Sequence, residues 1–394
     1  MKKLVLAYSG GLDTSYCLKS LSEEGYHVDA VSVNTGGFTQ DEILDQKYNA
    51  LKMGAKKFKS INALNSFYNK IVKYLIFGNV LKNNTYPLSV SSERIIQAIE
   101  IIKYAKEIGA DYIAHGSTGA GNDQVRFDLI FQVLAPDINI ITPIRDNKLT
   151  REYEINYLKS HGINISWEKA KYSINKGLWG TSIGGSETLT SNIPLPESAF
   201  PSQLLESKPQ KITLNFIKGE LVGLNGEKKS SVNLIQSLQE IAGKFAIGRD
   251  MHVGDTIIGI KGRVGFEASA PIIIIKAHHL LEKHTLTKWQ QFQKEQLSNF
   301  YGMLLHEGQY LDEVMRNIES FLENSQEKVN GDVFITLQPY RFQLDGISSP
   351  NDLTNDSFGS YGEINNTWSA NEAKGFIKIT ANANKIYNKV NSKK

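Results

Sequence analysis

Apolar positions along the first 160 residues follow two periods in alternation. Compact or alternating apolar runs predict strands over residues 3–9, 27–34, 56–62, 111–117 and 138–144. Apolar residues at helical spacing predict helices over residues 14–26, 41–55 and 92–110, each with a glycine at or near its end. Strands that alternate with helices of this length predict a doubly wound parallel sheet, an α/β domain covered on both faces.

The pattern changes after Gly162. Residues 171–210 are rich in Gly, Ser, Thr and Pro and show little periodicity, which predicts a long loop. Next come a hairpin with its turn at Asn225-Gly226 and then helical and strand-like stretches, predicted over residues 211–229, 233–246, 254–268, 271–300 and 332–347. This order predicts an α+β second domain. We expect three parts: residues 1–165, residues 171–363, and a short C-terminal arm over residues 364–394.

Composition narrows the classes of function. A net charge of +3 over 394 residues argues against a broad nucleic-acid footprint. The single cysteine, Cys17, excludes an internal disulfide framework and fits a reducing compartment. The N-terminal apolar run stops at Ala7, too short for a signal core, and the longest later run, Ile272–Ile275, is too short to span a bilayer. We therefore expect a cytoplasmic protein with neither a nucleic-acid nor a membrane partner.

The stretch "YSGGLDTS" lies where the first strand turns into the first helix. Gly10 and Gly11 allow a tight turn in which backbone N–H groups converge on an anion at the helix N-terminus. Hydroxyl groups on either side of the turn add donors, and Asp13 can help to hold the magnesium ion of a polyphosphate. The stretch lacks the lysine of the GxxxxGK loop. It predicts a phosphate cradle; the plainer alternative is an ordinary strand-to-helix turn with a serine cap.

The second chemical motif is "HGSTGAGNDQVRF", residues 115–127. It follows a predicted strand of the same parallel sheet, so it emerges at the same carboxyl edge as the first loop. Asp123 suits an ammonium group and Arg126 suits a carboxylate. A site that offers both charges predicts a zwitterionic ligand such as an amino acid.

The first loop resembles the SGGxDS/T loop of the ATP pyrophosphatases, and the two loops together resemble the argininosuccinate synthase family. Further stretches that are similar to the family run in its order along nearly the whole chain: "YPL", "LAPDINIITPIRD", "YSINKGLWGTS", "EIAGKFAIGRD" and "IIGIKGRVGFE". The resemblance implies a nucleotide-binding domain, a synthetase domain and an oligomerisation arm in a homotetramer. It also implies a ligase of arginine biosynthesis. ATP, with Mg²⁺, would adenylate the ureido oxygen of citrulline, pyrophosphate would leave, and the aspartate amine would displace AMP to give argininosuccinate.

The resemblance also implies a set of site residues. ATP would be bound by Ala7, Tyr8, Ser9, Gly10, Gly11, Leu12, Asp13, Thr14, Ser15, Val33, His115 and Gly116. Aspartate would be bound by Thr118, Asn122 and Asp123, and citrulline by Tyr86, Ser91, Asn122, Arg126, Ser173 and Ser182. The catalytic residues would be Ser9, Asp13, Asp123 and Arg126. No resident metal site is expected.

Three departures from the family fall in the implied citrulline pocket. Gly254 and Phe266 stand where the family has a glutamate and a tyrosine, and Asn175 stands where its YSxD motif has an acid. "YPLSVSSERI" stands where the family has YxLGTSxARP. A lost carboxylate leaves two alternatives open. Either the acceptor is an Nα-acylated citrulline, such as an N-acetyl or N-succinyl form, or a nearby acid, for instance Asp255 or Glu267, takes over and plain citrulline is used.

Two other classes of protein are alternatives. A tRNA-modifying ATP pyrophosphatase would adenylate a base, but such enzymes often use paired cysteines and need a basic surface, and this chain has one cysteine and little net charge. A non-catalytic relative would bind ATP as a regulatory subunit. The intact phosphate and aspartate loops argue against that second alternative.

Overall fold

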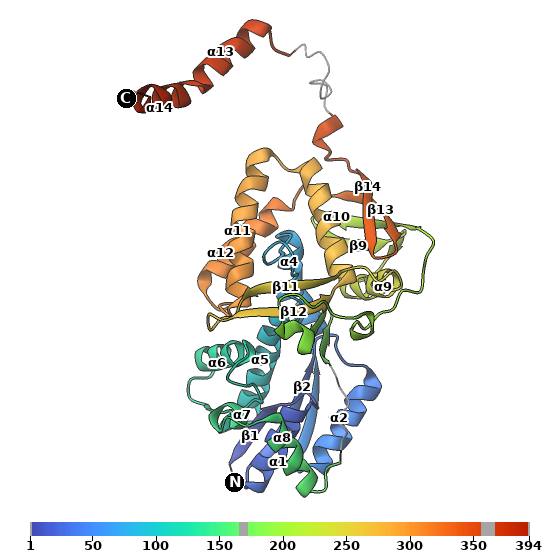
Figure 1. The fold of residues 1–394 in the computed structure, drawn as a ribbon, viewed down its shortest axis with the longest axis vertical. Coiled ribbons are helices and arrows are strands. Elements are labelled where there is room, and N and C mark those ends of the chain that lie inside the picture. Colours follow the sequence, from blue (N-terminus) through green and yellow to red (C-terminus); the bar gives the residue numbers. More distant parts are fainter. Residues whose placement is uncertain (1, 165–171, 356–366, 393–394) are drawn as a thin grey trace. The chain divides into compact units, whose positions relative to one another are not determined.

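The computed structural model describes residues 2–164, 172–355 and 367–392. The chain divides into two compact units, residues 1–351 and residues 352–394. The first unit contains one parallel and two antiparallel sheets, and the second contains the helices α13 (Ala370–Thr380) and α14 (Asn382–Asn391) (Figure 1). The predicted domain limits at residues 165, 171 and 363 lie outside the described residues.

The first sheet has five parallel strands in the order β3-β2-β1-β4-β5. Its strands are β1 (Lys3–Ala7), β2 (His27–Asn34), β3 (Lys57–Asn62), β4 (Tyr112–Ala114) and β5 (Asn139–Ile141). The chain runs outward from β1 to β3 and then returns to the other side of β1 at β4. This order creates a topological switch point between β1 and β4, the place where open α/β sheets bind ligands.

The side chains of β1 point alternately to the two faces of this sheet, and helices cover both faces. Leu4 and Leu6 are fully buried in a cluster with residues of α1 and α8, whereas Val5 belongs to the cluster that contains the apolar face of α5. The helices of this part are α1 (Leu12–Glu23), α2 (Gln40–Lys52), α3 (Leu64–Phe67), α4 (Lys73–Phe77), α5 (Ser89–Glu107), α6 (Asp123–Leu134), α7 (Pro143–Asp146) and α8 (Arg151–Ser160), with a π-helical turn at Tyr68–Val72. The predicted doubly wound α/β architecture is confirmed.

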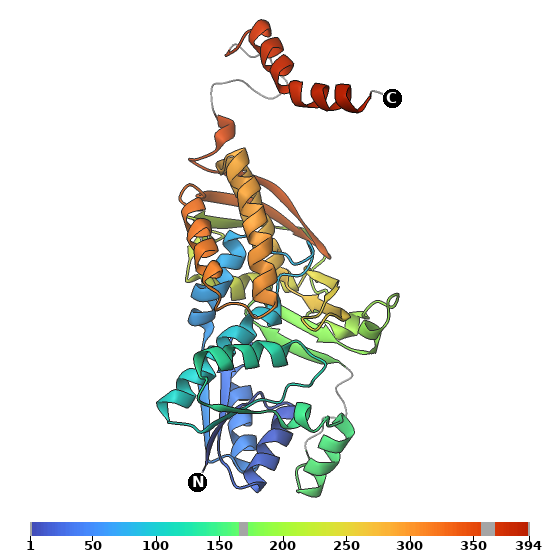
Figure 2. The same ribbon diagram turned by 90° about the vertical axis from the view of Figure 1, so that its left-hand side faces the viewer.

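The prediction of one long loop over residues 171–210 is wrong. Two strands from this stretch, β6 (Ser173–Gly177) and β7 (Gly180–Gly184), join β11 (Arg249–Asp255) and β12 (Lys261–Glu267) in an antiparallel sheet with the order β11-β12-β7-β6. This sheet contacts α5 (Figure 2). The sequences SINKG and GTSIG lack alternating apolar residues, so the hydrophobic pattern did not predict that they form strands.

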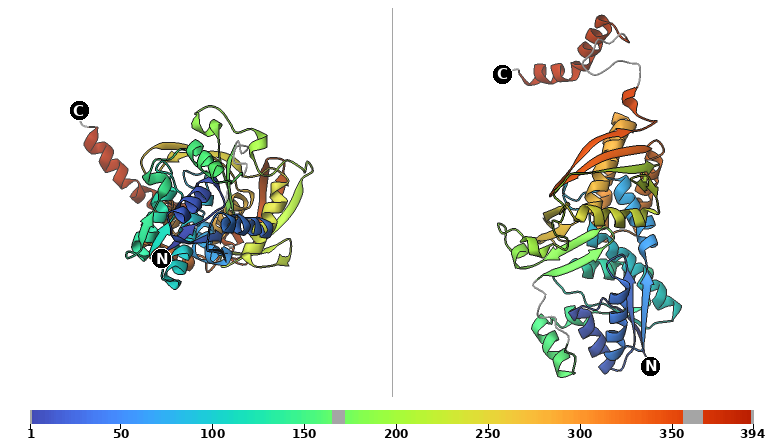
Figure 3. Two further views of the ribbon diagram at one scale, coloured as in Figure 1. Left: turned by 90° about the horizontal axis from the view of Figure 1, so that it is seen from below. Right: turned by 90° about the vertical axis from the view of Figure 1, so that its right-hand side faces the viewer.

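The second antiparallel sheet has the order β10-β9-β8-β13-β14 (Figure 3). Its strands are β8 (Gln210–Ile217), β9 (Glu220–Leu224), β10 (Glu227–Lys228), β13 (Gly331–Gln338) and β14 (Arg341–Ser348). The predicted hairpin is a three-stranded meander, and its main turn is Lys218-Gly219 rather than Asn225-Gly226. Lys218, Gly219, Asn225 and Gly226 all have positive φ, so both turns have the conformation that two-residue hairpins favour.

Four helices complete the first unit: α9 (Ser231–Gly243), α10 (Ser269–Thr285), α11 (Lys288–His306) and α12 (Glu313–Ser325). The helical stretch predicted over residues 271–300 is two helices, because Leu286 is extended and Thr287 caps α11 with its side chain and a capping box. One continuous core joins the α5 face of the parallel sheet to the β8–β13 sheet. Among the described residues, no helix has the length and apolarity needed to cross a membrane.

Candidate active site

The two predicted chemical loops lie against each other at the switch point between β1 and β4. A Cβ atom added to Gly116 would lie 3.1 Å from the carbonyl carbon of Asp13 and 3.2 Å from the backbone nitrogen of Thr14. The glycine therefore lets the backbone of the second loop approach the first turn of α1. The juxtaposition that the parallel sheet predicted is present.

The loop after β1 is held in shape by its own hydroxyl groups. The hydroxyl of Thr14 donates to the Gly11 carbonyl at 3.2 Å and lies 3.2 Å from the Ser9 hydroxyl, which in turn accepts from the Gly11 N–H at 3.3 Å. Gly11 caps α1 without a side-chain hydrogen bond, so the first N–H groups of the helix are available to a ligand. This arrangement suits an anion at the helix N-terminus.

His115 is fixed in one tautomer by its neighbours. Its Nδ1 accepts from the Ser117 N–H at 3.2 Å, so its Nε2 carries the proton and donates to Asp128 at 2.7 Å. Asp128 also pairs with Arg145 at 2.6 Å. The residue is only 1% exposed, and its ring stacks on Phe127. His115 is therefore a rigid wall of the site.

The glycine loop that follows His115 is held by a residue that the sequence analysis did not single out. The Gln124 side chain donates to the carbonyls of Gly119 and Gly121, at 2.6 and 3.2 Å. Asn122, which immediately precedes α6, accepts from the N–H of Ile257 in the turn between β11 and β12 at 2.9 Å. The second loop is thus fastened to the β11–β12 hairpin.

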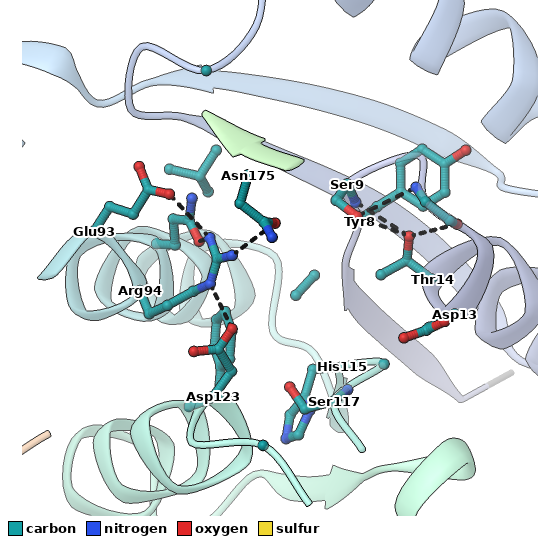
Figure 4. Close-up of a pocket in the computed structure, with 18 of the residues that line it drawn as sticks. Tyr8, Ser9, Asp13, Thr14, Glu93, Arg94, His115, Ser117, Asp123 and Asn175 are labelled. Atoms are coloured by element: carbon teal, nitrogen blue, oxygen red, sulfur yellow. Dashed lines mark hydrogen bonds and ion pairs between the residues drawn. The ribbon is translucent and has the colours of Figure 1, made fainter. Parts of the chain in front are cut away.

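Arg94 on α5 is the centre of a charged cluster at the cavity. Its Nε donates to Asp123 at 2.9 Å, its Nη1 to Glu93 at 3.2 Å and to Gln97 at 2.9 Å, and its Nη2 to Asn175 at 3.3 Å. Figure 4 shows this cluster opposite the Ser9–Thr14 pair. Although its position in a predicted helix was correct, the sequence analysis assigned Arg94 no role.

The charges of this cluster are set by burial and by two guanidinium groups. Burial alone would raise the pKa of Asp123, but Arg94 and Arg126 overcome this effect and hold its pKa below the usual value. Burial raises the pKa of Glu93 to about 7 against the opposing effects of Arg94 and of the Thr35 hydroxyl, which donates to it at 2.7 Å. Asp123 is therefore ionised at neutral pH, and Glu93 titrates near neutrality.

Glu93 is itself one of the departures of this sequence from the family pattern. It occupies the alanine position of YxLGTSxARP, next to the arginine that is Arg94 here, and Asn175 occupies the acid position of YSxD. Both side chains contact Arg94. Compared with the family pattern, Arg94 thus has an amide in place of a carboxylate at position 175 and gains a carboxylate at position 93.

The predicted citrulline residues form two groups. Asn122, Arg126 and Ser173 line the cavity, whereas Tyr86, Ser91 and Ser182 lie beyond it and are buried. The Tyr86 hydroxyl lies 3.1 Å from the Ser182 hydroxyl. Arg126 joins the two groups electrostatically, because its charge opposes the burial that raises the pKa of Tyr86.

Neither acid that was expected to replace the missing glutamate lies in the cavity. Glu267 is buried, pairs with Arg249 at 3.0 Å and accepts from the Ser202 hydroxyl at 2.6 Å. Asp255 is exposed and pairs with Lys261 at 2.6 Å. The expectation that one of these two acids takes over is wrong, because each already has a cation of its own.

The two loops and the charged cluster around Arg94 line a cavity of about 990 Å³. Fifteen of the predicted site residues line it: Ala7, Tyr8, Ser9, Gly11, Leu12, Asp13, Thr14, Val33, His115, Gly116, Thr118, Asn122, Asp123, Arg126 and Ser173. Gly10, Ser15, Tyr86, Ser91 and Ser182 do not. Thr35, Gly37, Phe38, Glu93, Arg94 and Gln97 also line it and were missed. The glycine-rich turn "NTGGFT" after β2 was a signal that could have found three of them.

Two family models match the chain in succession. The model described as "Arginosuccinate synthase N-terminal HUP domain" matches residues 3–164, and the model described as "Arginosuccinate synthase C-terminal domain" matches residues 172–387. The chain belongs to the argininosuccinate synthase family. The predicted family, and with it an ATP-using ligase of arginine biosynthesis, is confirmed.

Curated relatives agree over nearly their whole length. Argininosuccinate synthase of Pyrococcus furiosus is 38% identical over 96% of this chain and 92% of its own. Those of Methanocaldococcus jannaschii and Xanthomonas axonopodis pv. citri are 39% and 36% identical, over 91% and 99% of this chain and 91% and 95% of their own. A solved structure titled as a predicted subunit of tRNA methyltransferase, from Methanocaldococcus jannaschii, is 17% identical over 40% of this chain and 75% of its own, with a TM-score of 0.27. That likeness is too slight to bear on function.

These matches favour the argininosuccinate synthase function, with plain citrulline as the acceptor. They do not favour an Nα-acylated acceptor or a non-catalytic regulatory relative, because the named relatives are argininosuccinate synthases in bacteria and archaea alike. The matches assign no role to individual site residues, so those roles are argued from the geometry of the cavity.

Proposed function

We propose that the cavity at the β1–β4 switch point is where this chain joins citrulline and aspartate at the expense of ATP, giving argininosuccinate, AMP and pyrophosphate. The observation that carries the proposal is the contact of Gly116 with the first turn of α1. This contact brings the glycine turn after β1 and the loop over residues 115–127 to a single cavity, which supports a phosphate cradle beside amino-acid-binding groups. A nucleotide and two amino acids can meet there.

ATP is assigned to the side of the cavity formed by the loop after β1. Its phosphates face the N-terminus of α1, where N–H groups and the Ser9 and Thr14 hydroxyls are available. His115 and Gly116 form the floor beside them. Backbone donors fixed in advance stabilise the charge that builds up on the phosphates as pyrophosphate departs.

The amino acids are assigned to the opposite side. We assign Thr118, Asn122 and Asp123 to aspartate, with the Asp123 carboxylate facing its ammonium group. We assign Arg126 and Ser173 to the acceptor. Adenylation converts the ureido oxygen into a good leaving group, so the reaction needs no covalent nucleophile. Holding both amino acids beside the nucleotide can lower the barrier by about 7–11 kcal/mol.

Mg²⁺ fits the residues at the ATP side. Asp13 lines the cavity in the first turn of α1, and Mg²⁺ in nucleotide sites takes one or two carboxylates together with the substrate phosphates. Burial and the neighbouring Asp13 raise the pKa of Glu154 to about 8, so that carboxyl group is protonated at neutral pH. When bound, Mg²⁺ would neutralise part of the phosphate charge.

The oligomeric state and the compartment belong to the same proposal. On α13 and α14, six large apolar side chains are each more than 60% exposed: Phe376, Ile377, Ile379, Ile386, Tyr387 and Val390. Such a face on a monomer favours burial against another subunit. This supports the C-terminal arm as the oligomerisation element of a homotetramer, and we expect the protein in the cytoplasm.

The test is release of pyrophosphate by the purified protein with ATP, Mg²⁺, citrulline and aspartate. Formation of argininosuccinate and AMP in equal amounts, identified by mass spectrometry, is the expected result. Omitting citrulline should stop pyrophosphate release, since citrulline is the group that is adenylated. No pyrophosphate with any citrulline derivative would overturn the proposal.

A further inference from the structure

Four basic residues from different parts of the chain lie next to Tyr86 or Arg126, on the acceptor side of the cavity. Arg126 on α6 donates from Nε and Nη2 to the His306 carbonyl at the end of α11, at 3.0 and 2.9 Å. The ring of His252 on β11 stacks on Tyr86 at 5.2 Å. Lys82, in the turn before α5, is bridged to Tyr86 through backbone hydrogen bonds. Tyr86 and Arg126 thus bring Lys82, His252 and His306 into one neighbourhood.

The charges of these groups act on one another. Burial lowers the pKa of His252, and the Lys82 ammonium lowers it further. Burial, Arg126, Lys82 and His252 lower the pKa of His306 to about 3. Both imidazoles are therefore neutral at physiological pH, and the positive charge belongs to Lys82 and Arg126.

Lys82 is the member of the group that lacks a counter-ion. Its side chain is half-buried and, within the described part of the chain, its ammonium forms no ion pair. Burial lowers its pKa most, Glu307 and Asp255 oppose this effect in part, and Arg126 lowers the pKa by a smaller amount. Glu307 does not pair with it, and Asp255 is paired with Lys261. Asp123 is taken by Arg94 and Arg126. A half-buried cation without a partner costs free energy that an anionic ligand would recover.

His252 gives a second, independent indication of a ligand. It is only 6% exposed, and its Nδ1 is a buried polar atom without a hydrogen-bond partner among the described residues. A Cβ atom on Gly254 would lie 2.7 Å from the Nε2 of His252 and 3.3 Å from the amide nitrogen of Asn83. Only glycine at position 254 leaves room for the imidazole and the Asn83 amide, which both lie where a side chain at that position would be.

We propose that Lys82 and His252, together with Arg126, form a carboxylate-binding subsite at the acceptor end of the active site. The inference rests on the proposed function, which puts the acceptor next to Arg126. The carboxylate has two possible sources: the α-carboxylate of citrulline, or the terminal carboxylate of a dicarboxylic acyl group on its α-nitrogen. Lys82 supplies the positive charge, and the neutral imidazole of His252 supplies an N–H donor.

The test compares Lys82→Met with Lys261→Met, which removes an exposed lysine from the same β11–β12 neighbourhood. Pyrophosphate release is measured with citrulline, N-acetylcitrulline and N-succinylcitrulline. For Lys82→Met, the KM of the accepted substrate should rise about tenfold or more, while the KM of ATP and the thermal midpoint stay near the wild-type values. Lys261→Met should behave as the wild type. Lys82→Arg, which keeps the charge, should recover most of the loss.

The three acceptors identify the source of the carboxylate. A loss measured on citrulline assigns the subsite to the α-carboxylate. A wild-type preference for N-succinylcitrulline over N-acetylcitrulline that Lys82→Met abolishes assigns it to the acyl carboxylate. His252→Phe keeps the ring against Tyr86 but removes both nitrogens, and it should raise the same KM about threefold to tenfold. If Lys82→Met leaves every acceptor KM within twofold, the subsite is wrong. If the wild type releases no pyrophosphate with any acceptor, the proposed function itself fails.

Discussion

The guanidinium of Arg94 and the carboxylate of Asp123 form an ion pair of 2.9 Å between α5 and the start of α6. The same carboxylate accepts from Arg126 at 2.9 Å. Asp123 therefore presents a fixed geometry to a ligand, with its side chain still 36% exposed. The group that we assign to the aspartate ammonium is thus positioned by a residue from a different helix.

Replacing Arg94 should impair the use of aspartate. In Arg94→Met, Asp123 loses one of its two cations and is free to turn toward Arg126, so the KM of aspartate should rise at least tenfold and kcat should fall. The KM of ATP should stay within twofold of the wild type, because the phosphate cradle is untouched. Steady-state kinetics with each substrate varied in turn provides the measurement. Lys103→Met removes an exposed cation from the same helix and should change neither constant.

The backbone at Gly10 should be essential for ATP. Its φ is +79°, and an added Cβ would lie 3.0 Å from the Cγ of Gln46, whose amide donates to the Ser9 carbonyl. Gly10→Ala should therefore deform the phosphate loop and lower kcat/KM for ATP about a hundredfold. Gly109→Ala is the matched control, since Gly109 also has positive φ, +61°, but has no neighbour within 4 Å. An equal loss in both variants would argue for general backbone strain rather than for the loop.

Much of this architecture could be predicted because it is local. The limits of β2 coincide with the alternating run over residues 27–34, and Gly54 follows Met53, the residue that caps the C-terminal end of α2. The loop after β1 and the loop after β4 could be placed together because the edges of a parallel sheet follow from its strand order.

The remainder depends on pairings that leave no local trace. The strands β6 and β7 carry few apolar residues, and β12, which pairs with β7 on the side away from β6, lies some eighty residues farther along the chain. Arg94 fits a helix surface as well as a site, and only the folded chain reveals that Asp123, Glu93 and Asn175 converge on it. Likewise, the engagement of Glu267 by Arg249 could not be read from their spacing.

The C-terminal arm should control assembly. A chain that ends at residue 366 lacks the exposed apolar face of α13 and α14, so its molar mass in solution should fall below that of the full chain. Sedimentation velocity or light scattering after gel filtration measures this change. Phe376→Ser with Ile386→Ser should reproduce the change, whereas Lys374→Ser on the same arm should not. A truncated chain with the full molar mass would place the subunit interface elsewhere.

Glu93 should make folding stability depend on pH. An ordinary glutamate releases its proton near pH 4.5, whereas burial raises the pKa of Glu93 in the folded protein to about 7. Between these values the folded state holds the proton and the unfolded chain does not, so the free energy of unfolding falls as pH rises. The loss approaches about 3 kcal/mol above pH 7. Urea unfolding at pH 5 and pH 8 should show it in the wild type and not in Glu93→Gln. The same pH dependence in both proteins would assign the effect to other groups.

Moving a carboxylate from position 93 to position 175, on the other side of Arg94, should restore the use of aspartate that the loss of Glu93 impairs. In Glu93→Ala, Arg94 loses a carboxylate partner at 3.2 Å and pulls harder on Asp123, so the KM of aspartate should rise about tenfold. Asn175 contacts the opposite end of the same guanidinium at 3.3 Å, so Glu93→Ala with Asn175→Asp returns a carboxylate to Arg94 and should recover most of the loss. Asn175→Asp alone adds a third acid to the cluster and should bring no gain. A double variant that is no better than Glu93→Ala would mean that the two positions act independently, because coupled residues give non-additive effects.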